Sequence, residues 1–234
     1  GLSFSNRYSN GLSAAVTPEN EDDDFSQYST DLKLGCQFSK NLNVSVYGNK
    51  SELRSEFDAD RAEAPNRLKQ DQERVGIAST FKYGKGSIQL NAAYTDFEID
   101  TRSTFGESSA NGENFVFDIY NKYVFNDKFY TVLGVYYIKD KSSFTNAVDF
   151  SIVDPYANLV YVSDFGFNLN TGARLNTHSA YGNNFVYNVN PSYVFRTSEG
   201  YVKLLGTYAT SYITANLTQL FGDFGANPDL EPEE

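Results

Sequence analysis

The sequence has 234 residues, with 30 acidic and 19 basic side chains, a formal net charge of −11, 18 tyrosines and 19 phenylalanines. This charge balance argues against a nucleic-acid-binding protein, because affinity for phosphates requires clustered Lys and Arg. The single cysteine and single histidine exclude an intrachain disulfide framework and a zinc site made of several thiolates or imidazoles, and no apolar run approaches the ~20 residues of a membrane-spanning helix.

Alternation of apolar and polar residues, the pattern of strands with two different faces, recurs along the chain. From Tyr28 to Phe38 every second residue is apolar or weakly polar, and the residues between them are mostly polar. The same alternation returns in segments 42–49, 75–83, 88–94, 115–125 and 165–175. We therefore predict an all-β chain with about ten strands and a partial strand at its start.

Connections of two lengths separate these segments. Short turns are expected at 39–41, 84–86, 126–127, 163–164 and 196–199, and long polar loops at 10–24, 58–72, 101–112, 141–154 and 178–184. Because turns and loops alternate along the chain, all turns lie at one end of the sheet and all loops at the other. Transmembrane β-barrels have this arrangement, with short periplasmic turns and long extracellular loops, whereas a β-sandwich has no reason for it.

Aromatic residues concentrate near the predicted turns, as in the girdle at a membrane interface. They are Phe38, Phe81, Tyr83, Tyr123, Phe125, Phe129, Phe165, Tyr193, Phe195 and Tyr201. A simple preference of aromatics for strands is the alternative explanation, but it does not account for their gathering at one end. The mean hydropathy of −0.47 fits strands that meet lipid on one side only and line a wide aqueous lumen on the other.

Three segments resemble motifs of TonB-dependent outer-membrane receptors. Residues 211–222 read Ser-Tyr-Ile-Thr-Ala-Asn-Leu-Thr-Gln-Leu-Phe-Gly, residues 227–233 read Asn-Pro-Asp-Leu-Glu-Pro-Glu, and residues 172–182 read Gly-Ala-Arg-Leu-Asn-Thr-His-Ser-Ala-Tyr-Gly. In the third motif Asn176 stands where the family commonly has Asp. Within the family, Gly-Leu-Ser-Ala-Ala at 11–15 and the short 217–222 segment look most like cobalamin (vitamin B12) receptors.

The resemblance implies an antiparallel barrel of about 22 strands, of which this chain would supply about 10–11. Residues 1–234 are expected to be a middle portion of the barrel domain, with the plug domain and terminal strands absent from this chain. The implied location is the Gram-negative outer membrane. The implied function is binding of a scarce ligand for TonB-dependent active import, and no enzyme motif is found.

The ligand and the partners are expectations of the same kind. Cobalamin or another corrinoid is the first choice and a ferric siderophore the alternative, while a passive porin or an adhesin is the rival from another class, since fold alone does not decide function. Expected partners are the small-molecule ligand, outer-membrane lipid, the TonB complex through the missing upstream parts, and a surface lipoprotein. No nucleic-acid partner is expected.

Two acidic clusters flank the first hairpin, at 19–24 and 52–63. A turn centred between residues 40 and 41 places Asp23 opposite Asp58, where the like charges repel unless a cation joins them. Oxygen-only ligands suit calcium, which takes about 6–8 oxygens; the alternative is a solvated acidic rim. Cobalamin receptors order such loops with calcium, and the resemblance implies Glu21, Asp23 and Asp58 as Ca²⁺ ligands, with Asp60 nearby. Glu21 departs from the usual Asp.

Three further residues have interpretations of their own. Tyr212, near the base of a loop, is a reasonable contact for a large flat ligand. His178 lies at the end of a motif strand without a catalytic arrangement around it, so a structural role is favoured. Cys36 alternates with Leu34 and Phe38, which predicts that it faces lipid as a small hydrophobic residue.

Overall fold

The computed structural model describes residues 1–12, 22–58, 66–103, 106–143, 147–222 and 225–234. These residues form one antiparallel sheet of 12 strands and one short helix, which confirms the predicted fold class. The strands are β1 (Leu2–Ser9), β2 (Phe25–Gln37), β3 (Leu42–Phe57), β4 (Asn66–Tyr83), β5 (Gly86–Ser103), β6 (Gly106–Asn126), β7 (Phe129–Ser143), β8 (Ala147–Val162), β9 (Phe167–His178), β10 (Gly182–Arg196), β11 (Tyr201–Leu205) and β12 (Tyr208–Ala209), and the helix is α1 (Leu217–Phe221).

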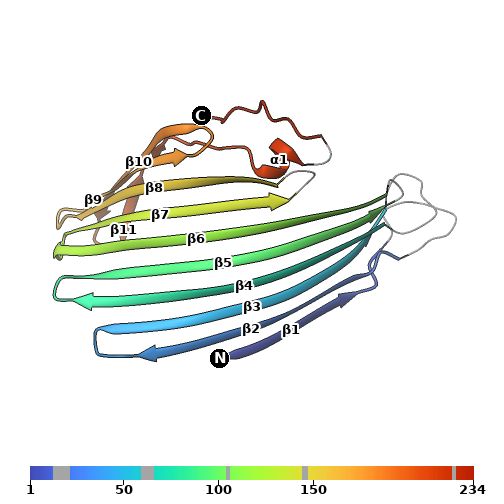
Figure 1. Ribbon diagram of the computed structural model, residues 1–234. Helices are drawn as coiled ribbons and strands as arrows, with labels where there is room; N and C mark the ends of the chain where they lie inside the picture. The colour runs from blue at the N-terminus through green and yellow to red at the C-terminus, as the bar shows by residue number, and fades with distance from the viewer. Residues whose placement is uncertain (13–21, 59–65, 104–105, 144–146, 223–224) are drawn as a thin grey trace.

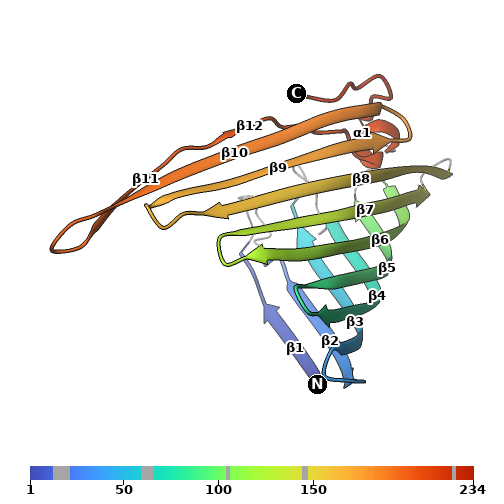
Figure 2. The same ribbon diagram turned by 90° about the vertical axis from the view of Figure 1, so that its left-hand side faces the viewer.

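The sheet is a meander in which each strand from β1 to β11 pairs with its neighbours in the sequence. Strand β12 pairs with β10 farther along from the β11 pairing, so the two short strands occupy the same edge. The sheet curves into an open trough with β1 at one edge and β11 at the other (Figures 1 and 2). In the described part of the chain, no helix has the length and apolar character that a membrane span requires.

The two faces of the sheet differ, as the period-two alternation predicts. One cross-strand row holds Leu32, Gly48, Val75, Tyr94 and Phe115, and we call its side of the sheet the apolar face. The opposite side, the polar face, carries most of the asparagines and glutamines of the strands. Apolar-face residues are uncovered: Val75 is 60% exposed and Leu34 57%. An exposed apolar surface of this size must be covered by lipid or by another molecule.

The apolar face is a band of limited height. On β4 it runs from Tyr83 at the turn to Val75, a stretch that matches the about 9–11 residues with which a tilted strand crosses a bilayer. The next residue on that side is Glu73, and its cross-strand partner on β5 is Asp96, followed by Glu113 on β6. Strands β3–β6 therefore continue well past the apolar band as charged β-structure.

Tyrosines lie over glycines of the adjacent strand at two places on the polar face. The Tyr47 ring covers Gly76, and its hydroxyl donates a hydrogen bond of 2.9 Å to Asn91 on the strand beyond. Tyr156 covers Gly134 in the same way and donates to Asp118 at 3.0 Å. A Cβ atom at Gly76 or Gly134 would lie 2.3 or 2.5 Å from the ring. Each tyrosine thus links three strands because the middle one has no side chain.

The short turns lie where the sequence predicts them, but four of the predicted long loops are wrong in extent. The 58–72 segment is strand from Asn66 onward, and β5 and β6 reach Ser103 and Gly106. Likewise β7 ends at Ser143, β8 begins at Ala147, and β9 and β10 are separated by residues 179–181 alone. Segments 66–74 and 106–114 are mostly polar, so hydrophobic alternation gave little signal for strands that backbone hydrogen bonds and cross-strand ion pairs stabilise. At the start of β8, Val148, Phe150 and Ile152 do alternate with Asp149 and Ser151, a signal that the loop prediction missed.

The register of the first hairpin differs by one position from the predicted one. Phe38 N–H donates to the Leu42 carbonyl at 3.0 Å, and the Ser39 hydroxyl accepts from the backbone of Asn41 and Leu42. These bonds centre the turn on Lys40, so Gln37 faces Asn43 and, farther up, Phe25 faces Ser55. The predicted opposition of Asp23 and Asp58 is therefore wrong by one residue.

The chain after β12 folds back across the loop end of β8–β10. Asn216 caps α1, because its side chain accepts from Gln219 N–H while the Gln219 side chain accepts from Asn216 N–H. Leu217 and Leu220 are buried, and α1 contacts β8. We call residues 210–222 and 225–234 the C-terminal segment; Figure 1 shows α1 beside the end of β8.

Candidate functional site

Polar side chains form a connected group on the polar face of β6, β8 and β9. Asp154 is buried, with 3% of the residue exposed, and its carboxylate accepts hydrogen bonds from Asn176 at 2.9 Å and from Arg174 at 3.4 Å. The Arg174 guanidinium also lies 5.7 Å from the centre of the Tyr156 ring, which donates to Asp118. Two carboxylates and one guanidinium thus share one surface of the trough. Charged groups that are buried in this way are stable only when they are paired.

A recess opens beside this group, between β8, β9, β10 and β12. It has a volume of about 330 Å³ and is lined by Tyr156, Asn158, Gly172, Arg174, Val186, Tyr187, Asn188, Thr210 and three alanines. The Asn158 and Asn188 amides lie on both sides of Gly172, so a Cβ there would be 3.1 Å from one and 3.3 Å from the other. The recess presents amides, three hydroxyl-bearing side chains and one cation, the groups that bind an oxygen-rich molecule or a peptide backbone.

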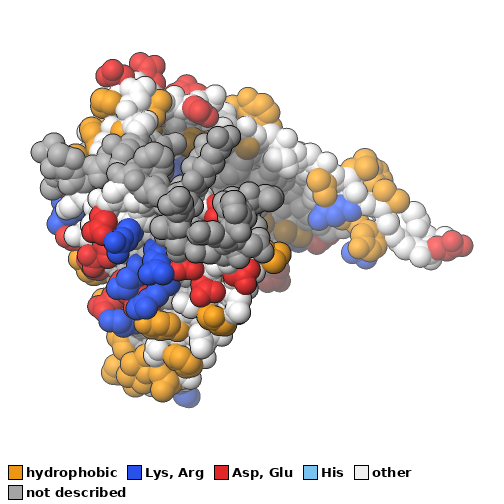
Figure 3. Space-filling view, turned by 90° about the vertical axis from the view of Figure 1, so that its right-hand side faces the viewer, with side chains coloured by type: hydrophobic (Ala, Val, Ile, Leu, Met, Phe, Trp, Pro, Cys, Tyr) orange, Lys and Arg blue, Asp and Glu red, His pale blue; other side chains and the backbone are white. Residues whose placement is uncertain are grey.

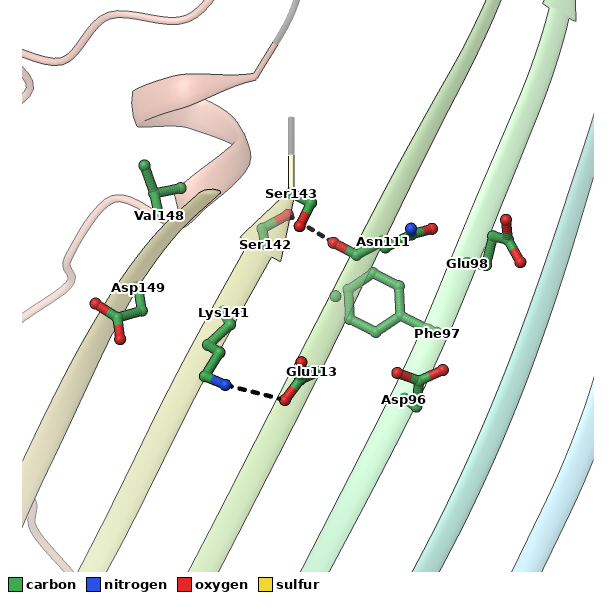
Figure 4. A pocket seen from close by; sticks show the side chains of 11 residues that line it. Asp96, Phe97, Glu98, Asn111, Glu113, Lys141, Ser142, Ser143, Val148 and Asp149 are labelled. Carbon is green, nitrogen blue, oxygen red and sulfur yellow. Dashed lines mark hydrogen bonds and ion pairs between the residues drawn. The ribbon is translucent and has the colours of Figure 1, made fainter. Parts of the chain in front are cut away.

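A larger cavity of about 660 Å³ lies where β5–β8 continue past the apolar band. Four charged residues in it are direct cross-strand neighbours, one on each strand: Asp96, Glu113, Lys141 and Asp149. Lys141 forms an ion pair of 3.2 Å with Glu113, while the Phe97 ring lies across Gly112 (Figure 4). The cavity is thus acidic overall, with Glu98 as a further carboxylate on its wall.

Charged side chains also gather at the loop end of β3–β6. Arg67 pairs with Glu56 at 2.9 Å, Arg54 with Glu52 at 2.7 Å and Lys69 with Asp71 at 2.6 Å. In Figure 3 basic and acidic groups lie side by side on this end of the molecule. The basic partners are exposed, whereas the carboxylates are only 12–32% exposed. Each pair is of small energetic value, but together they make this rim strongly polar.

The predicted calcium ligands fall partly inside the described residues. Asp23 lies two residues before β2, and Asp58 is the residue after β3. Glu21 and Asp60 lie outside the described residues. The closest acidic pair in the register is Asp24 with Glu56: Glu56 N–H donates to the Asp24 carbonyl at 2.8 Å. Among the described residues, no group of three or more His, Cys, Asp or Glu is arranged to hold a metal ion.

Tyr212 lies in the C-terminal segment and is half-buried. Burial raises the pKa of its hydroxyl, and the neighbouring Glu234 and Tyr181 raise it further. The phenol therefore stays a neutral hydrogen-bond donor at every physiological pH. Its position as a ligand contact remains a prediction.

Cys36 lies on the face where the alternation predicts it, and His178 lies at the end of its strand in a packed environment. Cys36 is exposed on the apolar face, across from Val44. His178, on the polar face, is 2% exposed and packs between Phe150 and Tyr181 with ring centres 4.7 and 4.8 Å apart. The sequence did not single out the Asp118, Tyr156, Arg174 and Asp154 group, although charged residues at polar-face positions inside a strand were a usable signal.

The fold is that of the barrel wall of bacterial outer-membrane receptors. No protein-family model matches the chain. A variant of the ferric enterobactin receptor of Pseudomonas aeruginosa superposes with a TM-score of 0.76 at 12% identity, over 90% of this chain and 37% of that one. The siderophore receptor PirA of Acinetobacter baumannii gives 0.74 at 13%, over 90% and 36%, and the copper transporter OprC gives 0.76 at 9%, over 99% and 44%.

This chain therefore spans between about a third and a half of the length of the receptors that it matches. At such low identity the likeness defines the architecture alone. It assigns the apolar face to the outside of a barrel and the polar face to the lumen, because closed barrels in lipid present apolar side chains outward. The Asp118–Tyr156–Arg174–Asp154 group and the 330 Å³ recess then face the lumen.

Proposed function

We propose that the chain is part of the barrel of a Gram-negative outer-membrane receptor that binds a scarce small molecule and imports it with energy from the TonB complex. One observation carries this proposal: a 12-stranded meander with an uncovered apolar band superposes on three ligand-transporting receptors. The sequence motifs at 172–182, 211–222 and 227–233 support the TonB-dependent family independently of the fold.

We further propose a corrinoid as the ligand, with a ferric siderophore as the second candidate. The motif resemblance at 11–15 and 217–222 supports the corrinoid. The structural neighbours, two of them siderophore receptors and one a copper transporter, support the siderophore alternative equally well. Both ligand classes are bulky and oxygen-rich, which suits the amide-lined recess between β8 and β10.

Uptake measurements distinguish these ligands. A strain that lacks the gene and one that carries the complete gene are compared for uptake of radiolabelled cyanocobalamin and of a ferric catecholate siderophore, with and without a proton-motive-force uncoupler. Uncoupler-sensitive uptake of one ligand that depends on the gene supports the receptor. Gene-dependent uptake that survives the uncoupler would instead indicate a passive porin, and no gene-dependent uptake of either ligand would leave an adhesin as the better explanation.

The calcium site is proposed in modified form. Asp23 precedes β2 and Asp58 follows β3, and Asp24 and Glu56 add two more carboxylates at the same hairpin end. Calcium bound there would order both loops before ligand arrives and so reduce the entropic cost of binding. The partners proposed with it are the ligand, outer-membrane lipid and a surface lipoprotein.

Calorimetric titration of the complete protein with calcium tests this site. We expect Asp23→Asn together with Asp58→Asn to weaken calcium affinity at least about tenfold, because each removes a charged oxygen ligand. Asp127→Asn, at the exposed turn between β6 and β7, is the matched control and should bind as the wild type does. Equal affinity in the double variant would show that the acidic cluster is a solvated rim.

A further inference from the structure

The C-terminal segment is attached to the loop end of β9 and β10 by a few specific contacts. The Tyr181 hydroxyl donates to the Leu230 carbonyl at 3.1 Å, and the Asn184 amide donates to the Glu234 carboxylate. A bridge between Ile213 and Glu233, with bonds of 3.0 and 2.9 Å, holds the two ends of the segment together. Asn184 shares the polar face with His178, so the segment crosses that face above the histidine.

His178 is fixed in one neutral tautomer by the turn that follows it. The backbone N–H of Ala180 donates to His178 Nδ1 at 3.0 Å, so Nδ1 carries a lone pair and the ring proton resides on Nε2. Nε2 is buried and has no hydrogen-bond partner among the residues that the structure describes. The turn has little freedom: Ser179 N–H donates to the Ser151 carbonyl, and Gly182 has a φ of 77°.

Protonation of this ring conflicts with the turn. An imidazolium carries protons on both nitrogens, so Nδ1–H would point at the N–H of Ala180, and two donors would meet at 3.0 Å. The charge would also lie between the Phe150 and Tyr181 rings without solvent. Relief requires residues 179–181 to move, and Tyr181, which holds Leu230, is one of them.

The charged and titratable groups around His178 determine the direction in which its pKa is shifted. Burial lowers the pKa of His178, and the carboxylate of Asp154 on β8, itself held by Arg174, opposes this in part. Tyr181 faces the ring from the turn, and behind Tyr181 lie Tyr212 and Glu234 of the C-terminal segment. With a pKa below the ordinary 6.5 in the seated state, proton uptake favours the released state.

We propose that His178 is a pH-sensitive latch: the neutral ring seats the C-terminal segment over the polar face, and protonation releases it by disrupting the Ala180 contact and, with it, the Tyr181–Leu230 bond. Stabilisation of the seated state is complete above the released-state pKa of about 6.5 and is lost as pH falls below it. The ratio of released to seated molecules then rises up to about tenfold per unit of difference between the two pKa values.

The test measures the distance between the segment and the sheet. Nitroxide labels are attached to cysteines that replace Asn183 and Asp229, both exposed, in the complete protein with Cys36→Ser, and pulsed electron paramagnetic resonance is recorded at about pH 7.5 and about pH 5. We expect a single short distance at the higher pH and an additional longer one at the lower. Identical distributions at both pH values would overturn the proposal.

Three variants separate the latch from general acid sensitivity. His178→Asn keeps an oxygen near the Nδ1 position for Ala180 but does not titrate, so its distances should not change with pH; a response like that of the wild type would contradict the mechanism. Asp154→Asn removes the carboxylate that favours the imidazolium and should shift the midpoint to lower pH. Tyr181→Phe lacks the hydroxyl that holds Leu230, so it should raise the released population at both pH values and weaken the pH dependence, because protonation acts on the segment through this bond.

Discussion

Gly134 is a residue at which a single added methyl group has a definite structural consequence. Its missing side chain allows Tyr156 to reach across β7 to Asp118. We expect Gly134→Ala to displace the ring, break this hydrogen bond and destabilise the barrel by about 1–3 kcal/mol, the usual range for overpacking. Denaturant-induced unfolding of the complete protein in lipid vesicles measures the effect.

Gly84→Ala is the matched control for that substitution. Gly84 lies in the turn between β4 and β5, and an added Cβ would meet nothing within 4 Å. Its stability should equal that of the wild type within about 0.5 kcal/mol, as for surface substitutions in general. If both alanine variants lose the same stability, the tyrosine contact is not the cause.

Asp154 and Arg174 depend on each other. The Asp154 side chain is 4% exposed and the Arg174 side chain 48%, so removal of the cation leaves a buried charge that the neutral donors, the Asn176 amide and the Thr177 backbone N–H, stabilise incompletely. We expect Arg174→Ala to cost about 3 kcal/mol, near the lower end of the range for breaking a buried pair. Adding Asp154→Asn should recover part of this loss; additive losses in the double variant, measured by the same unfolding assay, would show that the two side chains are not coupled.

The exact cross-strand partners of site residues were harder to predict than the face of the sheet on which a residue lies. Alternation correctly places Cys36 on the apolar face. It does not give hairpin register to one residue, because the turn centre depends on the Ser39 hydroxyl bonds to Asn41 and Leu42. That error moved the predicted acidic opposition from Asp24 and Glu56 to Asp23 and Asp58.

The helix α1 is the element that hydrophobic periodicity missed. Five residues are too short for a 3.6-residue repeat to emerge. The available signal is the spacing of Asn216 and Gln219, which form a capping box at the start of α1. Asn216 directly precedes Leu217, and Gln219 directly precedes Leu220. Helix ends can be recognised from caps even where the helix itself carries no periodic pattern.

Loss of this cap should loosen α1 selectively. We expect Asn216→Ala to destabilise the helix by about 1 kcal/mol, which would accelerate amide hydrogen exchange of residues 217–222 about fivefold. Thr218→Ala, an exposed helix position whose side chain makes no capping bond in the described residues, serves as control. Unchanged exchange in the Asn216 variant would mean that burial of Leu217 and Leu220 alone holds the helix.

Strand lengths were underestimated at one end of the sheet for a physical reason. Within the apolar band the alternation is sharp, and the strands there match their predicted positions. Beyond the band the side of the sheet that carries the apolar residues becomes charged, and pairs such as Lys50 with Glu73 at 2.5 Å replace apolar contacts. A method that reads burial from the sequence therefore ends each strand at the edge of the apolar band rather than at the end of the hydrogen-bonded ladder.

At the scale of the whole molecule, the orientation in the membrane can be tested directly. We expect the charged strand extensions to be extracellular and the short turns periplasmic. Cysteines replacing Glu107 and Lys85, both exposed, are introduced separately in the complete protein with Cys36→Ser. An impermeant maleimide on intact cells should label the first and not the second, and permeabilised cells should label both. Equal or inverted labelling of intact cells would refute this orientation.

The meander has a consequence for how the wall is assembled. Every pairing from β1 to β11 joins strands that are adjacent in the sequence, so each hairpin can form locally with a small loss of chain entropy. No strand has to be inserted between two that are already paired. The sheet can therefore grow one hairpin at a time from a free edge, and the time needed should scale with the number of hairpins rather than with a search through alternative strand orders.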